Sequence, residues 1–186
     1  HRDLHEAVRT DGSGTDRPAV HAQTSATYRL LDELRRRHPG LDIESCSSGG
    51  ARVDLGVLER TDRVWTSDCN DALERVAIQR WTGLLVPPER MGTHIGPPTA
   101  HTTHRHLDLS LRMLVALGGH AGLEWDITTC STDELDALRA WSALYRELRP
   151  LLHGGDAVRS DHPDPALVVG GVVAADRSAA VFTVIQ

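Results

Sequence analysis

The chain has 186 residues, of which 40% are hydrophobic and 25% are charged, as is usual for a soluble domain with a buried core. Its apolar stretches, such as residues 166–175, are far shorter than the roughly 20 residues that cross a bilayer, so we expect no membrane-spanning segment. The formal net charge of -6 and the absence of a long basic run argue against a nucleic-acid-binding surface.

The three cysteines, Cys46, Cys69 and Cys130, are too few and too scattered for a disulfide framework, and their odd number leaves at least one thiol free. A reducing compartment is the simpler expectation, so we predict a cytoplasmic location. No signal segment follows His1, and the first residue is not methionine, so we expect that the true start of the protein is missing.

The first third of the chain is predicted to alternate helices and strands, because helical and alternating apolar patterns follow one another. A glycine-rich run, Ser47–Gly50, follows the first strand, and Asp68 ends the second. The expected elements are an amphipathic helix over 20–38, a strand over 41–46, a short helix over 55–59 and a strand over 63–67.

The middle of the chain continues this alternation around one long loop. Asp71, with Glu74 three positions later, resembles a capping box before a helix whose apolar stripe ends at Trp81. Gly, Pro, Thr and His residues without any period predict a loop over residues 91–106. The other expected elements are strands over 84–86 and 122–127 and helices over 107–117 and from Thr132 to Leu152.

From Ala157 onward the sequence changes to β-branched runs, which indicate the opening of an antiparallel β domain. Alternating strands and helices before that point favour an α/β fold with parallel strands. About four βα units are counted, whereas a closed barrel has eight strands. We therefore predict the C-terminal half of a (β/α)8 TIM barrel over residues 1–155 and the start of a truncated β-sandwich domain over 156–186.

Functional side chains of such a barrel gather at the carboxyl ends of the strands. Two predicted strands end in polar loops of this kind, residues 46–50 and residues 65–68. These segments also resemble the α-galactosidases of glycoside hydrolase family 36, and the resemblance covers nearly the whole chain. The segments that carry it are 44–54, 65–75, 91–94 and 123–126, which follow one another in the order and spacing of that family.

The resemblance implies a retaining mechanism with two carboxylates, in which Asp68 is the acid/base. The alternative for Asp68 is a helix N-cap, which Asp71 fills in the capping-box interpretation. The nucleophile of the family stands in a Lys-Trp-Asp motif that would precede His1, so we expect it upstream of this chain. Neither Asp3 nor Asp11 matches that motif.

The resemblance also implies that the small residues after the first strand lie against the sugar, where backbone amides and hydroxyls can approach ring oxygens. The alternative is an ordinary turn. Ala51 departs from the glycine of the family, and Cys46 lacks the histidine base that a nucleophile would need. The expected substrate-binding residues are Cys46, Ser47, Ser48, Gly49, Gly50 and Trp65.

Three histidines, His101, His104 and His106, raise the alternative of a zinc site. We favour a polar surface loop, because no carboxylate or cysteine joins them at a known ligand spacing. Trp125 and Asp126 are equally compatible with the sugar site and with structural roles. No metal or organic cofactor is expected.

The resulting hypothesis is an α-galactosidase that acts, when complete, on terminal galactosyl residues of sugars such as melibiose and raffinose, and that forms homo-oligomers. One alternative is a galactosyl transferase of the same superfamily. Another is a degenerate homologue that only binds carbohydrate, motivated by Ala51 and by Ala121, which replaces an aromatic residue of the family. Without the nucleophile and the remaining strands, the 186-residue chain is expected to be inactive and unstable alone.

Overall fold

The computed structural model describes residues 8–10, 12, 16–46, 52–164 and 166–186. Contacts divide the chain into two compact units, residues 1–68 and residues 69–186. Within the described ranges, no helix is both long enough and apolar enough to cross a membrane.

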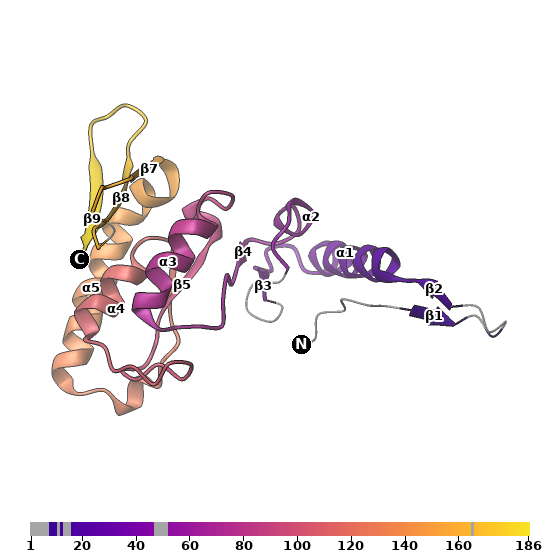
Figure 1. The fold of residues 1–186 in the computed structure, drawn as a ribbon, viewed down its shortest axis with the longest axis horizontal. Helices are drawn as coiled ribbons and strands as arrows, with labels where there is room; N and C mark the ends of the chain where they lie inside the picture. The colour runs from indigo at the N-terminus through magenta and orange to yellow at the C-terminus, as the bar shows by residue number, and fades with distance from the viewer. Residues whose placement is uncertain (1–7, 11, 13–15, 47–51, 165) are drawn as a thin grey trace. The chain divides into compact units, whose positions relative to one another are not determined.

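The first unit combines helices with two short two-stranded sheets (Figure 1). β1 and β2 pair as an antiparallel hairpin that the sequence patterns did not predict. β3 and β4 pair in parallel, with Glu44 opposite Arg63 and Ser45 opposite Val64. The elements are β1 (Val8–Thr10), β2 (Asp16–Pro18), α1 (Val20–Arg37), β3 (Glu44–Ser45), α2 (Leu55–Leu58) and β4 (Arg63–Val64).

Two carboxylates tie α1 to the rest of the first unit. Asp54 begins α2 by accepting a hydrogen bond from Val57 N, and it also accepts one from the Tyr28 hydroxyl of α1 at 2.7 Å. Asp62 accepts from Ile43 N and forms an ion pair with Arg35 of α1. These contacts place α1 against α2 and against the β3–β4 pair.

The second unit contains three α-helices, a parallel strand pair and an antiparallel sheet (Figure 1). β5 pairs in parallel with β6, and β8 lies between β7 and β9. The elements are α3 (Ala72–Thr82), the 3-10 turn η1 (Pro88–Arg90), β5 (Gly92–Ile95), α4 (Leu109–Ala116), β6 (His120–Leu123), the 3-10 turn η2 (Ile127–Thr129), α5 (Thr132–Gly154), β7 (Asp156–Ser160), β8 (Val168–Val173) and β9 (Ala180–Ile185).

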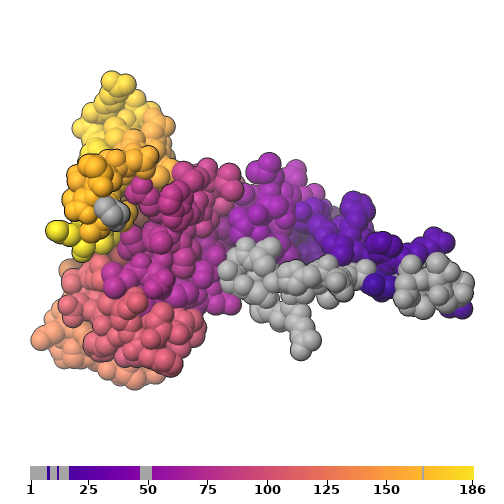
Figure 2. Space-filling view, in the orientation of Figure 1, coloured from indigo at the N-terminus to yellow at the C-terminus, as the bar shows by residue number. Residues whose placement is uncertain are grey.

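The core of the second unit lies along α5. One cluster joins Leu117, Tyr145 and Leu152 to Val172 of β8, and a second joins Ile95 and Ala116 to Leu138. The antiparallel sheet therefore packs on the helices of the same unit. The residues of β8 and β9, yellow in Figure 2, form part of the surface of this unit. The expected division of the chain at residue 155 stays a prediction.

Two predictions in the middle of the chain are wrong. Residues 84–86 form a turn instead of a strand, because Leu84 N and Val86 N donate to Trp81 O and Thr82 O at the end of α3. The strand of this region is β5, which lies inside the predicted loop 91–106. Leu85 is 86% exposed, so a short apolar run did not indicate burial here.

Strand boundaries in the last part of the chain also differ from the expected ones. β6 spans His120–Leu123 instead of 122–127, because its register is set by pairing with β5, and η2 follows at Ile127. The two predicted runs 167–169 and 172–173 form one strand, β8, through two glycines. β7 was not predicted because its sequence Asp-Ala-Val-Arg-Ser has no apolar alternation and is largely exposed.

Candidate active site

Two residues that the resemblance places at the active site, Cys46 and Asp68, come together in the first unit. Cys46 follows β3 directly and Asp68 lies shortly beyond β4, so the parallel pairing brings both to the same edge of this sheet. Cys46 Sγ donates a hydrogen bond to Asp68 Oδ1 over 3.7 Å, and Asp68 is exposed. The geometry presents a carboxylate to solvent with a thiol donor beside it.

Of the other expected substrate-binding residues, the structure describes only Trp65. Trp65 is 6% exposed, and its backbone N–H donates to Ser45 O at 2.8 Å, which extends the β3–β4 pairing by one residue. Ser47, Ser48, Gly49 and Gly50 lie outside the described residues, as does Ala51. Contact of these residues with a sugar stays a prediction.

The capping role considered for Asp68 belongs to Asp71. Asp71 begins α3, and its Oδ1 accepts hydrogen bonds from Leu73 N at 2.9 Å and from Glu74 N at 3.3 Å. Short polar side chains satisfy the free N–H groups of a helix start in this way. Asp68 is therefore not needed to begin the helix.

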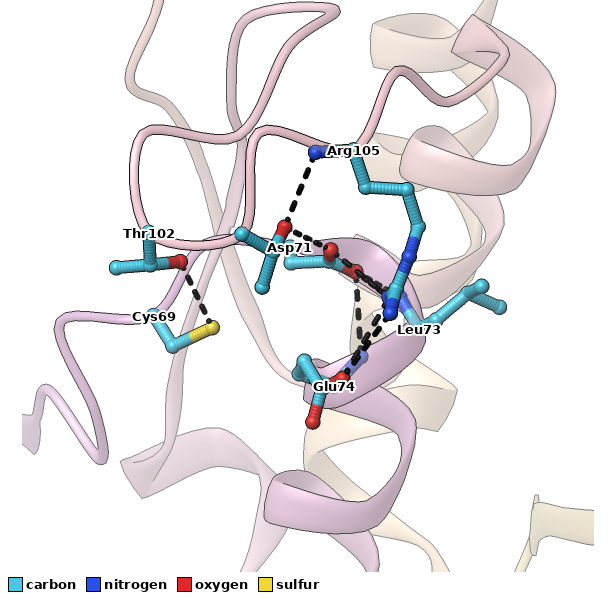
Figure 3. A network of polar contacts seen from close by, with 7 residues as sticks. Cys69, Asp71, Leu73, Glu74, Thr102 and Arg105 are labelled. Carbon is cyan, nitrogen blue, oxygen red and sulfur yellow. Dashed lines mark hydrogen bonds and ion pairs between the residues drawn. The ribbon is translucent and has the colours of Figure 1, made fainter.

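Asp71 also anchors the loop between β5 and α4, as Figure 3 shows. Arg105 Nη1 lies 2.9 Å from both Asp71 oxygens, and Thr103 Oγ1 donates to Oδ2 at 2.5 Å. Burial raises the pKa of Asp71, but hydrogen bonds from Thr103, Glu74 N and Leu73 N, together with the charge of Arg105, lower it below the usual value. The buried carboxylate is thus held ionised between the loop and α3.

The three loop histidines do not converge in the structure. His101 and His104 are exposed, and His106 Nδ1 lies 3.2 Å from Thr99 Oγ1 across an isolated strand bridge. Across residues 8–10, 12, 16–46, 52–164 and 166–186, no group of three His, Cys, Asp or Glu side chains is arranged to hold a metal ion.

Trp125 and Asp126 have structural roles in the second unit. Trp125 packs against the Ile95 and Leu138 cluster, and the Arg112 guanidinium lies 4.6 Å from the centre of its ring. Asp126 begins η2 by accepting from Thr128 N, and hydrogen bonds from Thr128 lower its pKa. These contacts give both residues a structural role, and their contact with a sugar stays an open alternative.

A polar cluster that the sequence patterns did not reveal joins Asn70, His94 and Glu124. Asn70 Nδ2 donates to Glu124 Oε2 at 3.1 Å, and His94 Nδ1 lies 3.4 Å from the same oxygen. Glu124 follows the end of β6, His94 is near the end of β5, and Asn70 precedes α3. Their positions at strand ends were the available signal, but residues so far apart in sequence give no sign of mutual contact.

Comparisons with known proteins agree with the resemblance found in the sequence. Residues 1–155 match the family model described as Melibiase. The chain is 49% identical to the alpha-galactosidase of Escherichia coli over 170 residues, which cover 91% of this chain and 24% of that protein. It is 36% identical to alpha-galactosidase AgaA of Geobacillus stearothermophilus over 165 residues, which cover 88% of this chain and 23% of that protein.

Solved structures give the same result. A crystal structure of AgaA from Geobacillus stearothermophilus superposes with a TM-score of 0.85 at 35% identity, covering 89% of this chain and 23% of that one. The alpha-galactosidase from Lactobacillus brevis gives a TM-score of 0.86 at 34% identity, and the match covers 90% of this chain and 23% of that one. The chain thus spans about a quarter of the relatives that it matches. The family match over residues 1–155 and these likenesses show that the chain belongs to the melibiase family, within glycoside hydrolase family 36.

Proposed function

We propose that this chain is part of a retaining α-galactosidase and that Asp68 is its acid/base. The observation that carries the proposal is the contact between Cys46 and the exposed Asp68 at the carboxyl edge of the β3–β4 pair. That edge is where (β/α)8 enzymes hold their catalytic groups. The family match and the relatives named alpha-galactosidases support the same activity.

We further propose that residues 1–155 are the C-terminal half of a (β/α)8 barrel. Of the three strand pairs that the structure describes before α5, β3–β4 and β5–β6 are parallel and the hairpin β1–β2 is antiparallel, and helices separate the parallel strands along the chain. Parallel neighbours joined through helices are the repeating unit of such a barrel. The antiparallel sheet β7–β8–β9 would then open the domain that follows the barrel.

The proposed mechanism needs two carboxylates about 5 Å apart. Asp68 donates its proton to the glycosidic oxygen while the second carboxylate attacks the anomeric carbon, so a covalent galactosyl-enzyme forms as the aglycone leaves. Asp68, now ionised, takes a proton from water, and the resulting hydroxide displaces the second carboxylate. By resemblance, that second carboxylate lies before His1. Cys46 would orient Asp68 through Oδ1.

Terminal α-galactosides such as melibiose and raffinose are the proposed substrates. One matching structure is an AgaA variant described as a complex with raffinose, which supports this class. Cys46, Ser47, Ser48, Gly49, Gly50 and Trp65 are proposed to bind the galactosyl ring. The complete protein is proposed to be a cytoplasmic homo-oligomer. Cys46, Cys69 and Cys130 are not joined in disulfides in the described part of the chain, which is consistent with a reducing compartment.

The decisive experiment is Asp68→Ala in the complete protein. Raffinose has a poor leaving group that needs protonation, so we expect its hydrolysis to fall at least about a hundredfold, the lower range for general acid catalysis. An aryl galactoside with an activated leaving group should keep more of its rate, and azide should raise that rate because it attacks the intermediate without a base.

Asp133→Ala, which removes an exposed carboxylate at the start of α5, is the matched control and should keep the unmodified rate. Raffinose turnover by Asp68→Ala at the unmodified rate would contradict the assignment. Product analysis with acceptor sugars separates hydrolysis from galactosyl transfer, because transfer would yield a new oligosaccharide in place of free galactose.

A further inference from the structure

Glu124 is oriented through only one of its two carboxylate oxygens. Asn70 Nδ2 and His94 Nδ1 both approach Oε2, whereas Oε1 contacts no partner in the described parts of the chain. The Glu124 side chain is 55% exposed. A carboxylate fixed on one side and open on the other can accept hydrogen bonds from a ligand.

Asn70 supplies a second, independent observation. The residue is 7% exposed, and its buried Oδ1 has no hydrogen-bond partner among the described residues, although buried polar atoms normally have one. The Asn70 carboxamide is thus held in place through the hydrogen bond that its Nδ2 donates to Glu124, and its acceptor stays unused among the described residues.

Two glycines allow this cluster to form. A Cβ at Gly96 would lie 2.4 Å from Asn70 Nδ2, and one at Gly122 would lie 3.0 Å from His94 Cδ2. Any larger residue at Gly96 would displace the Asn70 amide. The backbone around the cluster is therefore shaped to admit these side chains, at the carboxyl ends of the parallel strands β5 and β6.

We propose that Glu124, positioned by Asn70 and His94, is a substrate-binding residue for the sugar on the leaving side of the glycosidic bond. This inference rests on the proposed function. A sugar hydroxyl can donate to the open Glu124 Oε1, which fits a neutral polyhydroxylated ligand. Residues 46–50 are already proposed to bind the galactosyl ring of the substrate. We therefore assign Glu124 to the other sugar, which leaves when the glycosidic bond breaks.

Chain connectivity supports this choice of sugar. Asn70 follows Asp68 by two residues, and two Cα–Cα steps span at most about 7.6 Å. Asp68 is proposed to protonate the oxygen that joins the two sugars. The chain itself therefore keeps the Asn70 Cα within that distance of the Asp68 Cα.

The test is Glu124→Gln in the complete protein, with raffinose and 4-nitrophenyl α-galactoside as substrates. Gln keeps one oxygen for Asn70 and His94 but removes the charge. We expect kcat/KM for raffinose to fall about tenfold or more, as expected for loss of a hydrogen bond to a charged group, and kcat/KM for the aryl substrate to fall less than about threefold. Glu147→Gln, on the exposed face of α5, is the matched control.

Isothermal titration calorimetry with sucrose, the leaving part of raffinose, separates this proposal from the catalytic one. The unmodified protein should bind sucrose and Glu124→Gln should bind it at least about tenfold more weakly. If the unmodified protein hydrolyses neither substrate, the proposed function fails. The sucrose titration then still tests, by itself, whether Glu124 contributes to sugar binding. Equal losses on both substrates, or unchanged raffinose kinetics and sucrose affinity, would overturn the proposal.

Discussion

Asp71 joins two structural roles in one side chain that is fully buried. It begins α3 through Leu73 N and Glu74 N, and it holds the loop before α4 through Thr103 and Arg105 (Figure 3). The loop also has backbone hydrogen bonds of its own, such as Leu107 N to Pro98 O, and Asp71 joins it to the start of α3. Substitution should affect both the helix start and the loop.

Asp71→Asn should lower the free energy of unfolding by roughly 1–3 kcal/mol at neutral pH, because bonds to an ionised acceptor are lost in a buried site. Since the pKa of Asp71 is lowered in the folded protein, its contribution is complete above its usual value of 3.8 and is lost as pH falls through the lowered pKa. The difference from the unmodified protein should therefore shrink in acid.

Calorimetric unfolding of both proteins from pH 7 down to about pH 3 measures this difference. Asp133→Asn, an exposed carboxylate in the first turn of α5, is the control and should change stability by less than about 0.5 kcal/mol. A difference that grows as pH falls would contradict the role assigned to Asp71.

The residues of the site differed in how well sequence could identify them. Asp68 stands in a recognisable motif at a strand end, and the structure brings it to Cys46. Asn70, His94 and Glu124 lie far apart in the chain and meet only because β5 and β6 pair and Asn70 stands at the start of α3. Contacts that depend on strand register leave no local pattern.

Among the elements, α5 is fixed at its start by a reciprocal pair of hydrogen bonds. Ser131 Oγ accepts from Glu134 N at 3.2 Å, and the Glu134 carboxylate accepts from Ser131 N at 2.8 Å. The bond from Ser131 N is the main cause of the lowered pKa of Glu134. The helix carries the core residues Leu138, Tyr145 and Leu152, so its start affects the whole second unit.

Ser131→Ala should lower the free energy of unfolding by about 0.5–2 kcal/mol. Ser131→Gly should lower it by only about a few tenths of a kcal/mol, because glycine readily adopts the backbone conformation of the cap. Thermal unfolding of the complete protein with each variant tests this, and both variants should leave kcat unchanged. Equal melting temperatures for Ser131→Ala and the unmodified protein would show that the cap contributes nothing.

Helices were predicted better than strands for a physical reason. The stripes of α1, α3 and α5 recur over many residues, and caps such as Asp71 mark their starts. β5 reads Gly-Thr-His-Ile, with no apolar alternation, and its burial follows from pairing with β6 and from the bond of Thr93 Oγ1 to Ala116 O. Those partners are remote in sequence, so local pattern could not identify the strand.

At the scale of the whole molecule, the described residues include strand edges and apolar side chains that the proposed barrel would cover. Among the described residues, β3–β4 and β5–β6 are two-stranded parallel sheets, so no strand of either sheet is paired with a strand on both sides. Large apolar side chains are also exposed, including Leu85 at 86% and Phe182 at 58%. Parallel sheets are normally covered on both faces, and exposed apolar patches favour association.

We therefore predict that the 186-residue chain expressed alone associates and releases no galactose. Association follows from the open edges and exposed apolar residues. Inactivity follows from the proposed retaining mechanism, which needs a second carboxylate that we propose lies outside these residues. Size-exclusion chromatography with light scattering measures the first property, and galactose release from melibiose measures the second, with the complete protein as the positive control. A monomeric chain that melts cooperatively would refute the structural argument, whereas galactose release by the purified chain would place both carboxylates within these 186 residues.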